Sequence, residues 1–211
     1  MNKILPERIG IMGGTFDPIH YGHLLIAQSA ADEFQLERII FLPTGKSPHK
    51  SEGQVTDPAI RCEMVRIAIR ENPSFSLSEI EVANSHTNYT YLTLQKFRQM
   101  YPGTKLYFIM GEDSLDHLST WRHPEEICRQ ASILAAVRSG NQINQVQAKI
   151  EQAKKQFGAD MYMLHAPAFL ISSQEIRERV RTGRSIHYML PGEVESFISG
   201  HSLYKTGWKE R

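Results

Sequence analysis

Two histidines, separated by a tyrosine and a glycine, stand in a glycine-rich segment near the start of the chain. The segment Gly13–His23 reads GGTFDPIHYGH and follows the apolar run 8–12. Paired glycines let a backbone turn sharply and approach a ligand closely, and the free amides of a following helix favour phosphate. His20 and His23 share one side of the first helical turn, so both imidazoles could donate hydrogen bonds to phosphate oxygens as charge builds on a leaving group. The spacing therefore predicts a site for a phosphorylated ligand.

Other interpretations of this segment stay open at the level of sequence. A glycine-rich turn with two surface histidines would have the same letters. A zinc pair is a second alternative, with Asp17 nearby but no further ligand at an obvious spacing. The dinucleotide fingerprint G-x-G-x-x-G is absent. The residues at 45–47 resemble the end of a P-loop, but Ile40 stands where that motif needs its first glycine.

A second candidate block lies towards the other end of the chain, where residues 171–177 read ISSQEIR. Ser172 or Ser173 suits a helix N-cap. The hydroxyls, the first helical amides and the planar guanidinium of Arg177 could together hold triphosphate oxygens. For this segment alone, an ordinary capping box with a solvated arginine is the better interpretation.

Alternating apolar runs and helical patterns predict an α/β domain with a Rossmann-like, mainly parallel sheet covered by helices on both faces. Strands are expected at 8–12, 38–42, 75–82, 105–110, 133–137 and 161–164, and helices at 22–34, 57–69, 90–100, 124–130, 141–157, 173–181 and 192–198. The polar helix at 141–157 is expected to be a solvated face. No repeat or linker divides the chain, so residues 1–211 are expected to form a single domain. Because ligands of such sheets bind outside the carboxyl ends of the strands, the loops after Met12, Leu42, Met110 and Leu164 should line one site.

Composition narrows the class of partner. The chain has 24 basic and 23 acidic side chains and a formal net charge of +1, which argues against a polybasic surface for nucleic acid or membrane. Cys62 and Cys128 lie outside any C-x-x-C pattern, so a reducing compartment fits. The N-terminal residues lack the apolar stretch of a signal peptide, and no apolar run approaches about 20 residues. We expect a cytoplasmic protein with no nucleic-acid or membrane partner, and a homo-oligomer is compatible with the sequence.

Taken together, the two blocks resemble the H-x-G-H and I-S-S-T-x-I-R signatures of the nucleotidyltransferase α/β superfamily. The context of Gly13–His23 is similar to that of bacterial nicotinate-nucleotide adenylyltransferases, and the resemblance covers most of the chain. It implies transfer of AMP from ATP to nicotinate mononucleotide in NAD biosynthesis, giving deamido-NAD and pyrophosphate by in-line displacement without a covalent intermediate. Gln174 departs from the family's Thr or Ser, and Asn88 replaces a Ser in the family's S-Y-T.

The resemblance also implies roles for individual residues. The catalytic set is His20, His23 and Arg177. The ATP-binding set is Gly13, Gly14, Thr15, Phe16, His20, His23, Gly111, Asp113, Ser172, Ser173 and Arg177. The mononucleotide-binding set is Asp17, His49, Lys50, Thr90, Trp121, Arg122 and Arg138. Mg²⁺ is the expected cofactor, bridging phosphates through water without a dedicated protein ligand.

Several of these residues also have simpler structural interpretations. Asp113 and Thr90 each suit a helix N-cap, and Trp121 could anchor its loop in the core instead of stacking on a pyridine ring. Arg122 stands where the family commonly has Tyr. The loop Ser47–Lys50, which resembles the family's P-P-H-K, is expected to close over substrate as a mobile lid. A related transferase with another acceptor, such as phosphopantetheine, and a non-catalytic nucleotide-binding module remain the alternatives.

Overall fold

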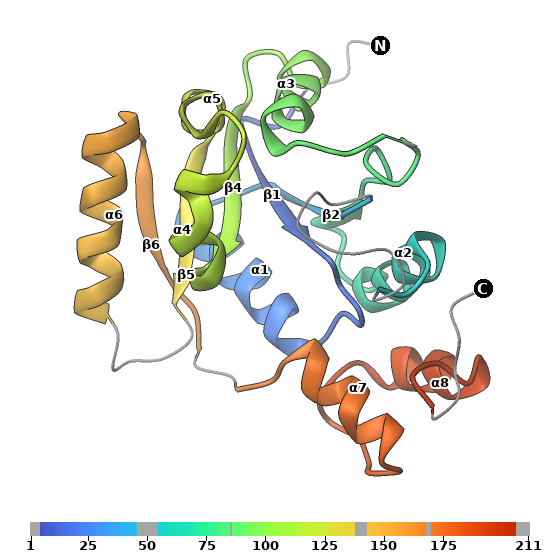
Figure 1. Ribbon diagram of the computed structural model, residues 1–211. Coiled ribbons are helices and arrows are strands. Elements are labelled where there is room, and N and C mark those ends of the chain that lie inside the picture. Colours follow the sequence, from blue (N-terminus) through green and yellow to red (C-terminus); the bar gives the residue numbers. More distant parts are fainter. Residues whose placement is uncertain (1–4, 46–54, 85, 138–142, 168–169, 206–211) are drawn as a thin grey trace.

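A six-stranded parallel sheet forms the centre of the molecule (Figure 1). The computed structural model describes residues 5–45, 55–84, 86–137, 143–167 and 170–205. The strand order is β3-β2-β1-β4-β5-β6, and every neighbouring pair is parallel. The strands are β1 (Arg8–Gly14), β2 (Arg38–Pro43), β3 (Phe75–Leu77), β4 (Lys105–Gly111), β5 (Ser132–Val137) and β6 (Met161–His165). This order is that of a Rossmann-like sheet, so the predicted fold class is confirmed.

The inner strands are nearly continuous apolar runs because both of their faces are covered. All six residues of β5 are buried. In β1, Gly10 lies opposite Ile39 of β2. A Cβ at Gly10 would lie 2.7 Å from the Ile39 side chain and 3.0 Å from that of Ile109. The missing side chain therefore lets two large neighbours pack over the middle of β1.

Helices cover both faces of the sheet and enclose two apolar cores (Figure 1). One core packs against α1 (Tyr21–Phe34), α2 (Pro58–Ile69), α7 (Ser173–Arg181) and α8 (Gly192–Gly200). The other packs against α3 (Thr90–Met100), α4 (Glu112–His117), α5 (Pro124–Gln130) and α6 (Ile143–Phe157), and the 3₁₀ turn η1 (Leu118–Thr120) joins α4 to α5.

Three features differ from the sequence prediction. The expected strand 75–82 pairs only over Phe75–Leu77, because the chain turns back where the amide of Ala83 donates to the carbonyl of Glu79. The short helix α4 was not predicted; Glu112 and Asp113 lie in its first turn, where negative charge favours a helix. Helix α6 has a polar, solvent-facing side as expected, but its other side is buried.

A buried stripe explains the packing of α6 against the sheet. Val146, Ile150 and Ala153 recur at helical spacing and are buried. Lys149 on the same helix pairs with Asp116 at 2.6 Å and with Glu112 at 3.6 Å. The expected solvated face therefore has a buried counterpart that packs against β6, and α6 also has charged contacts to α4.

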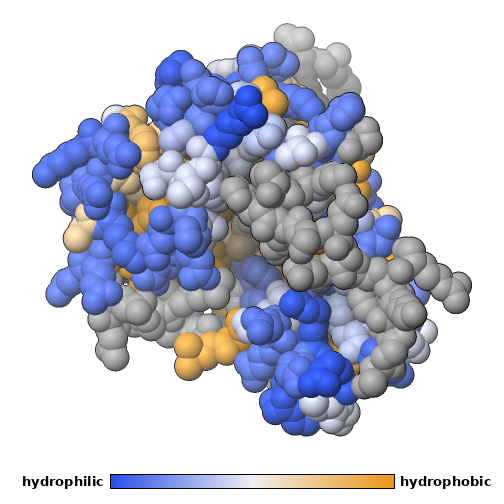
Figure 2. Space-filling model, viewed as in Figure 1, coloured by the Kyte–Doolittle hydropathy of each residue, from blue (hydrophilic) through white to orange (hydrophobic). Residues whose placement is uncertain are grey.

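The face seen in Figure 2 is mainly hydrophilic and has a hollow near its centre. Among the residues described, every helix is too short or too polar to cross a lipid bilayer. Cys62 and Cys128 are both buried and are not joined in a disulfide.

Candidate active site

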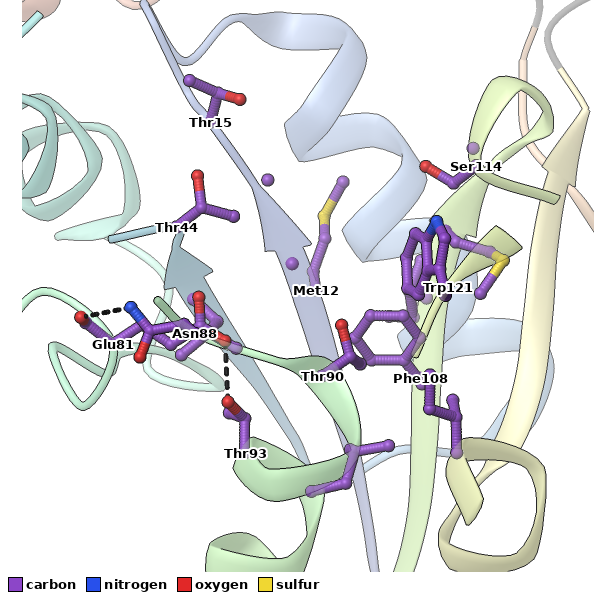
Figure 3. Close-up of a pocket in the computed structure, with 18 of the residues that line it drawn as sticks. Met12, Thr15, Thr44, Glu81, Asn88, Thr90, Thr93, Phe108, Ser114 and Trp121 are labelled. Carbon is purple, nitrogen blue, oxygen red and sulfur yellow. Dashed lines mark hydrogen bonds between the residues drawn. The ribbon is translucent and has the colours of Figure 1, made fainter. Parts of the chain in front are cut away.

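The carboxyl ends of β1 and β4 meet at the point where the strand order reverses direction, which is where such sheets bind ligands. A cavity of about 810 Å³ opens there. Figure 3 shows Thr15 and Thr44 on the side of β1 and β2, and Trp121 and Ser114 on the opposite side. The cavity is within the usual size range of small-molecule sites. The loops after Met12, Leu42 and Met110 line it as predicted, whereas the loop after Leu164 lines a separate small recess at Ala166 and Pro167.

The two histidines lie at the start of α1, beside this cavity. His20 is the N-cap residue and is 3% exposed, whereas His23 lines the cavity. Their rings are stacked, with centroids 3.8 Å apart, and the Phe16 ring meets His23 edge-on at 5.1 Å. A Cβ at Gly22 would lie 3.0 Å from the His20 ring, so glycine between the histidines makes room for this stacking.

A hydrogen bond fixes the tautomer of neutral His23. The amide of His20 donates to Nδ1 of His23 at 3.3 Å. Because one nitrogen of a neutral imidazole accepts and the other donates, the proton of neutral His23 is assigned to Nε2. His23 thus presents a donor in either protonation state, as a group that stabilises phosphate charge must.

The second sequence block contacts the first directly. The hydroxyl of Ser173 donates to the carbonyl of Pro18 at 2.9 Å, and Nη1 of Arg177 donates to the carbonyl of Asp17 at 2.6 Å. These contacts join residues 155 and 160 positions apart. Ser172 is the N-cap of α7, since its hydroxyl accepts from the amide of Glu175 at 3.1 Å. The fold therefore brings the two predicted phosphate-binding blocks together.

Asp17 faces the protein interior rather than the large cavity. It is 3% exposed. One carboxylate oxygen accepts from the Thr56 amide at 3.1 Å, and the other accepts from the Tyr204 hydroxyl at 2.7 Å. Burial, together with the negative charge of Asp17, raises the pKa of Tyr204, which therefore stays a neutral donor. These contacts give Asp17 a role in holding the histidine loop, and they do not place its carboxylate against a ligand.

The opposite wall of the cavity carries three of the four predicted mononucleotide residues that the structure describes, Asp17 being the exception. Thr90, Trp121 and Arg122 all line it, as do Gly111 and Asp113 from the predicted ATP set. Trp121 is half-buried and meets Phe108 edge-on, with ring centroids 6.2 Å apart. Trp121 therefore both packs on the core and faces the cavity, so its two sequence interpretations are compatible.

Arg122 lies over an aromatic ring at the rim of the cavity. Its guanidinium is 5.0 Å from the centroid of the Tyr89 ring, and Nη1 is 3.5 Å from the Tyr89 hydroxyl. Such a contact orients an exposed arginine at modest energetic gain. The arginine that replaces the family's Tyr is thus held beside Trp121.

A buried carboxylate that the sequence analysis did not single out also lines the cavity. Glu81 is 6% exposed and accepts from the Thr93 hydroxyl at 2.8 Å and from the Gly45 amide. Its carbonyl accepts from the Asn88 carboxamide at 2.9 Å (Figure 3). Burial raises the pKa of the Glu81 carboxyl, although its hydrogen bonds from Thr93 and Gly45 act in the opposite direction. No local motif marks this residue; only the folded cavity reveals it.

Two helix starts differ from the simpler interpretations, and one further residue was missed. The N-cap of α4 is Gly111 rather than Asp113, and the N-cap of α3 is Tyr89 rather than Thr90. His117, which the sequence placed with surface histidines, is exposed but also lines the cavity. Gln174, the departure from the second family signature, is exposed.

Some predicted residues lie outside the described part of the chain. They are His49 and Lys50, the loop Ser47–Lys50 to which they belong, and Arg138. Within the described part, no group of three or more His, Cys, Asp or Glu side chains could hold a metal ion. The three-ligand zinc site that a histidine pair could suggest therefore finds no support among these residues.

Residues 11–179 match the sequence profile of the cytidylyltransferase-like family. Fold, strand order and the position of the cavity agree with a nucleotidyltransferase of this class. The nicotinic acid mononucleotide adenylyltransferase of Plasmodium falciparum, solved in complex with NaAD, superposes with a TM-score of 0.77 at 22% identity, covering 94% of this chain and 97% of its own. At that identity the superposition supports the fold.

Relatives with higher sequence identity show to which family of nucleotidyltransferases the chain belongs. A protein of Thermoanaerobacter sp. (strain X514), described as a probable nicotinate-nucleotide adenylyltransferase, is 42% identical over 199 residues, which cover 94% of each chain. A protein of Desulfitobacterium hafniense (strain Y51) with the same description is 40% identical over 200 residues, covering 95% of this chain and 97% of its own. The chain belongs to the nicotinate-nucleotide adenylyltransferase family.

Proposed function

We propose that this enzyme transfers AMP from ATP to nicotinate mononucleotide, releasing pyrophosphate and forming deamido-NAD. The observation that carries the proposal is the meeting of the two blocks, in which Ser173 and Arg177 bind the Asp17-Pro18 carbonyls beside the stacked histidines. That meeting gathers imidazoles, a guanidinium and a helix N-terminus at one edge of the sheet. All three kinds of group favour phosphate.

The proposed catalytic groups act by positioning and by charge. His20, His23 and Arg177 stabilise the triphosphate as a phosphate oxygen of the acceptor attacks the α-phosphorus and pyrophosphate leaves. No protein nucleophile is needed. The two thiols are unsuited to that role, since burial raises the pKa of Cys62 and raises that of Cys128 to about 11.

The two substrates are assigned to opposite sides of His23. The adenine is assigned to the side of His23 where Gly22, Ile171 and Val137 bound a small recess. Gly111 and Asp113 are assigned to its ribose, and the glycine turn at 13–16 with Ser172 and Ser173 is assigned to the phosphates. The large cavity takes the mononucleotide, with Trp121 stacked on the pyridine ring and Thr90 beside it.

Mg²⁺ is proposed to arrive with ATP and to neutralise part of its charge. The described residues offer no three-membered donor set, and this fits an ion that keeps waters and binds mainly substrate oxygens. The unpaired cysteines support a reducing compartment, so the cytoplasm is proposed as the location.

A panel of acceptors tests this function against its rivals. Pyrophosphate release is measured with ATP and nicotinate mononucleotide, nicotinamide mononucleotide or phosphopantetheine. Release with phosphopantetheine alone would identify a related transferase, and ATP binding without release would identify a non-catalytic module.

The nicotinate acceptor should be preferred over its amide. A carboxylate only accepts hydrogen bonds, whereas a carboxamide also presents N–H donors. Donors and the positive charge of Arg122 on the cavity wall favour the carboxylate. An opposed polar group in a closed site costs about 1–3 kcal/mol, or roughly 10- to 10²-fold in kcat/KM. Equal kcat/KM for the two acceptors would show that the acceptor pocket is misassigned, while the ATP site would stand.

A further inference from the structure

Among the residues that the structure describes, Arg61 is the largest fully buried side chain, at 2% exposure. It lies in the first turns of α2, and its guanidinium donates to three main-chain carbonyls. Nη1 binds Thr15 at 2.7 Å, Nη2 binds Thr44 at 2.8 Å and Nε binds Thr56 at 2.8 Å. None of its hydrogen-bond partners in the described chain is a carboxylate; the guanidinium is bound by main-chain carbonyls, and the nearby charges of Asp17 and Asp57 oppose the lowering of its pKa by burial.

The three carbonyls belong to separate segments that Arg61 joins. Two further hydrogen bonds connect them: the Thr44 amide donates to the Gly14 carbonyl at 2.9 Å, and the Thr56 amide donates to the Asp17 carboxylate at 3.1 Å. Thr15 follows β1, Thr44 follows β2 and Thr56 precedes α2. The side chains of Thr15 and Thr44 line the large cavity and flank its β1 side (Figure 3). A planar fork with donors on three nitrogens can span three such acceptors at once, whereas a lysine ammonium has its donors at a single point.

Holding these carbonyls also sets the direction of the neighbouring amides. In a planar trans peptide, the C=O and the N–H point opposite ways. With the Thr44 carbonyl on Arg61, the Gly45 amide is turned to the carboxylate of Glu81, which accepts it. With the Thr15 carbonyl on Arg61, the Phe16 amide is turned away from α2.

The Phe16 backbone needs this support. Its φ is 50°, a left-handed value that costs energy for a bulky residue. A Cβ at Gly14 would lie 2.8 Å from the Phe16 ring, so the turn is folded tightly on itself. Phe16 belongs to the residues assigned to ATP, and its amide orientation depends on a strained turn whose preceding carbonyl Arg61 holds.

We propose that Arg61 is a positioning residue for nucleotidyl transfer. It fixes the distance between the loop after β1 and the loop after β2, so that the backbone amides and threonine hydroxyls of these loops are already oriented to bind phosphate. This role rests on the proposed function, in which the triphosphate binds at the turn after β1. Arg61 itself touches no reacting atom.

The test compares Arg61→Lys with Arg66→Lys. Arg66 lies on the same helix, at the surface, where it pairs with Glu63 and Glu79. Thermal unfolding is measured first, and kinetics follow at a temperature where each variant is fully folded. Arg61→Lys keeps the charge but loses the three-point contact, so kcat should fall about 10-fold or more with a higher KM for ATP, the scale expected for misplaced binding groups. Arg66→Lys should match wild type.

Wild-type kinetics of a folded Arg61→Lys enzyme would overturn the proposal and leave Arg61 a stabilising residue only. If that variant does not fold, amide exchange of the ligand-free wild type decides: slow exchange at Gly45, whose peptide carbonyl Arg61 binds, supports the clamp, and exchange at unstructured rates overturns it. Titration calorimetry with ATP alone separates this proposal from the proposed acceptor. An inactive wild type would reject nicotinate mononucleotide, yet weaker ATP binding by Arg61→Lys would still support the role of Arg61.

Discussion

Beside β1, the site is held by side chains that donate to main-chain carbonyls, whereas beside β4 it is a wall of side chains that face the cavity. On the first side, called here the histidine side (residues 13–23 with Arg61, Ser173 and Arg177), at least five such hydrogen bonds fix the backbone. On the second, the acceptor wall (Thr90, Trp121 and Arg122), the lining groups come from α3 and the turn after η1.

The difference between the two sides matches two different demands: the groups that stabilise charge need fixed positions, whereas the groups that select the acceptor can vary. Groups that stabilise a developing charge must be placed within a fraction of an ångström, so the histidine side uses buried main-chain contacts. A wall of separate side chains can change residue by residue. The departures Asn88 and Arg122 both line the cavity, whereas Gln174, the departure near the histidine side, is exposed.

The largest effect on activity should follow from removal of the His23 side chain. His23→Ala removes a donor to the leaving phosphate, and kcat should fall by roughly 10²-fold or more with modest loss of ATP affinity. Single-turnover kinetics and ATP titration measure the two quantities. His117→Ala is the matched control, because His117 lines the same cavity outside the motif. Near-normal turnover by His23→Ala would remove the central catalytic assignment.

The next effect concerns the geometry of Arg177. Arg177→Lys keeps the charge, but a lysine cannot hold the Asp17 carbonyl and triphosphate oxygens together as a planar fork does. We expect kcat/KM for ATP to fall about 10-fold to 10²-fold, the worth of a charged hydrogen bond. Arg181→Lys, on the same helix and paired with Glu178 at 2.6 Å, is the control. Equal activity of the two lysine variants would make Arg177 an ordinary helix residue.

The contrast between the two sides also explains what sequence could predict. Apart from Arg61, the residues of the histidine side lie in two short blocks, so their spacing alone placed them at a strand end and a helix start. Helix α2 could be predicted equally well, since Asp57 caps it by accepting from the Ala59 amide at 2.7 Å and Pro58 is its first residue. The buried roles of Arg61 and Glu81 could not be predicted from the sequence. Each looks like an ordinary charged residue, and its burial arises only when loops distant in sequence meet around it.

A smaller effect should follow from a change in the acceptor wall at Trp121. Trp121→Ala should raise KM for the mononucleotide by roughly 10-fold, within the range of lost aromatic stacking on a base, while KM for ATP stays near wild type. Trp121→Phe keeps an aromatic face on Phe108 and should restore much of the acceptor affinity. Initial rates with each substrate varied in turn measure both constants. An equal rise in the two KM values would mean that Trp121 supports the whole site and is not specific to the acceptor.

The smallest effect is a pH dependence of stability that comes from Glu81, which also lines the cavity. Burial raises the pKa of Glu81 above its usual value of 4.5, although the hydrogen bonds from Thr93 and Gly45 oppose the shift. The folded protein therefore holds this proton more tightly than the unfolded chain. The contribution of Glu81 to the free energy of unfolding is fully present below the unfolded pKa, and it is lost as pH rises through the folded pKa.

Glu81→Gln, which keeps the shape and one accepting oxygen but cannot ionise, tests this sign. Urea unfolding of both proteins between about pH 4 and about pH 8 spans the titration of a carboxyl group. Wild type should lose stability relative to Glu81→Gln as pH rises, because only wild type must bury a charge there. Glu71→Gln, at an exposed turn, should show no such trend. A difference between wild type and Glu81→Gln that stays constant with pH would show that the hydrogen bonds from Thr93 and Gly45 balance burial at Glu81, and one that changes in favour of wild type as pH rises would show that they outweigh it; either result contradicts the prediction.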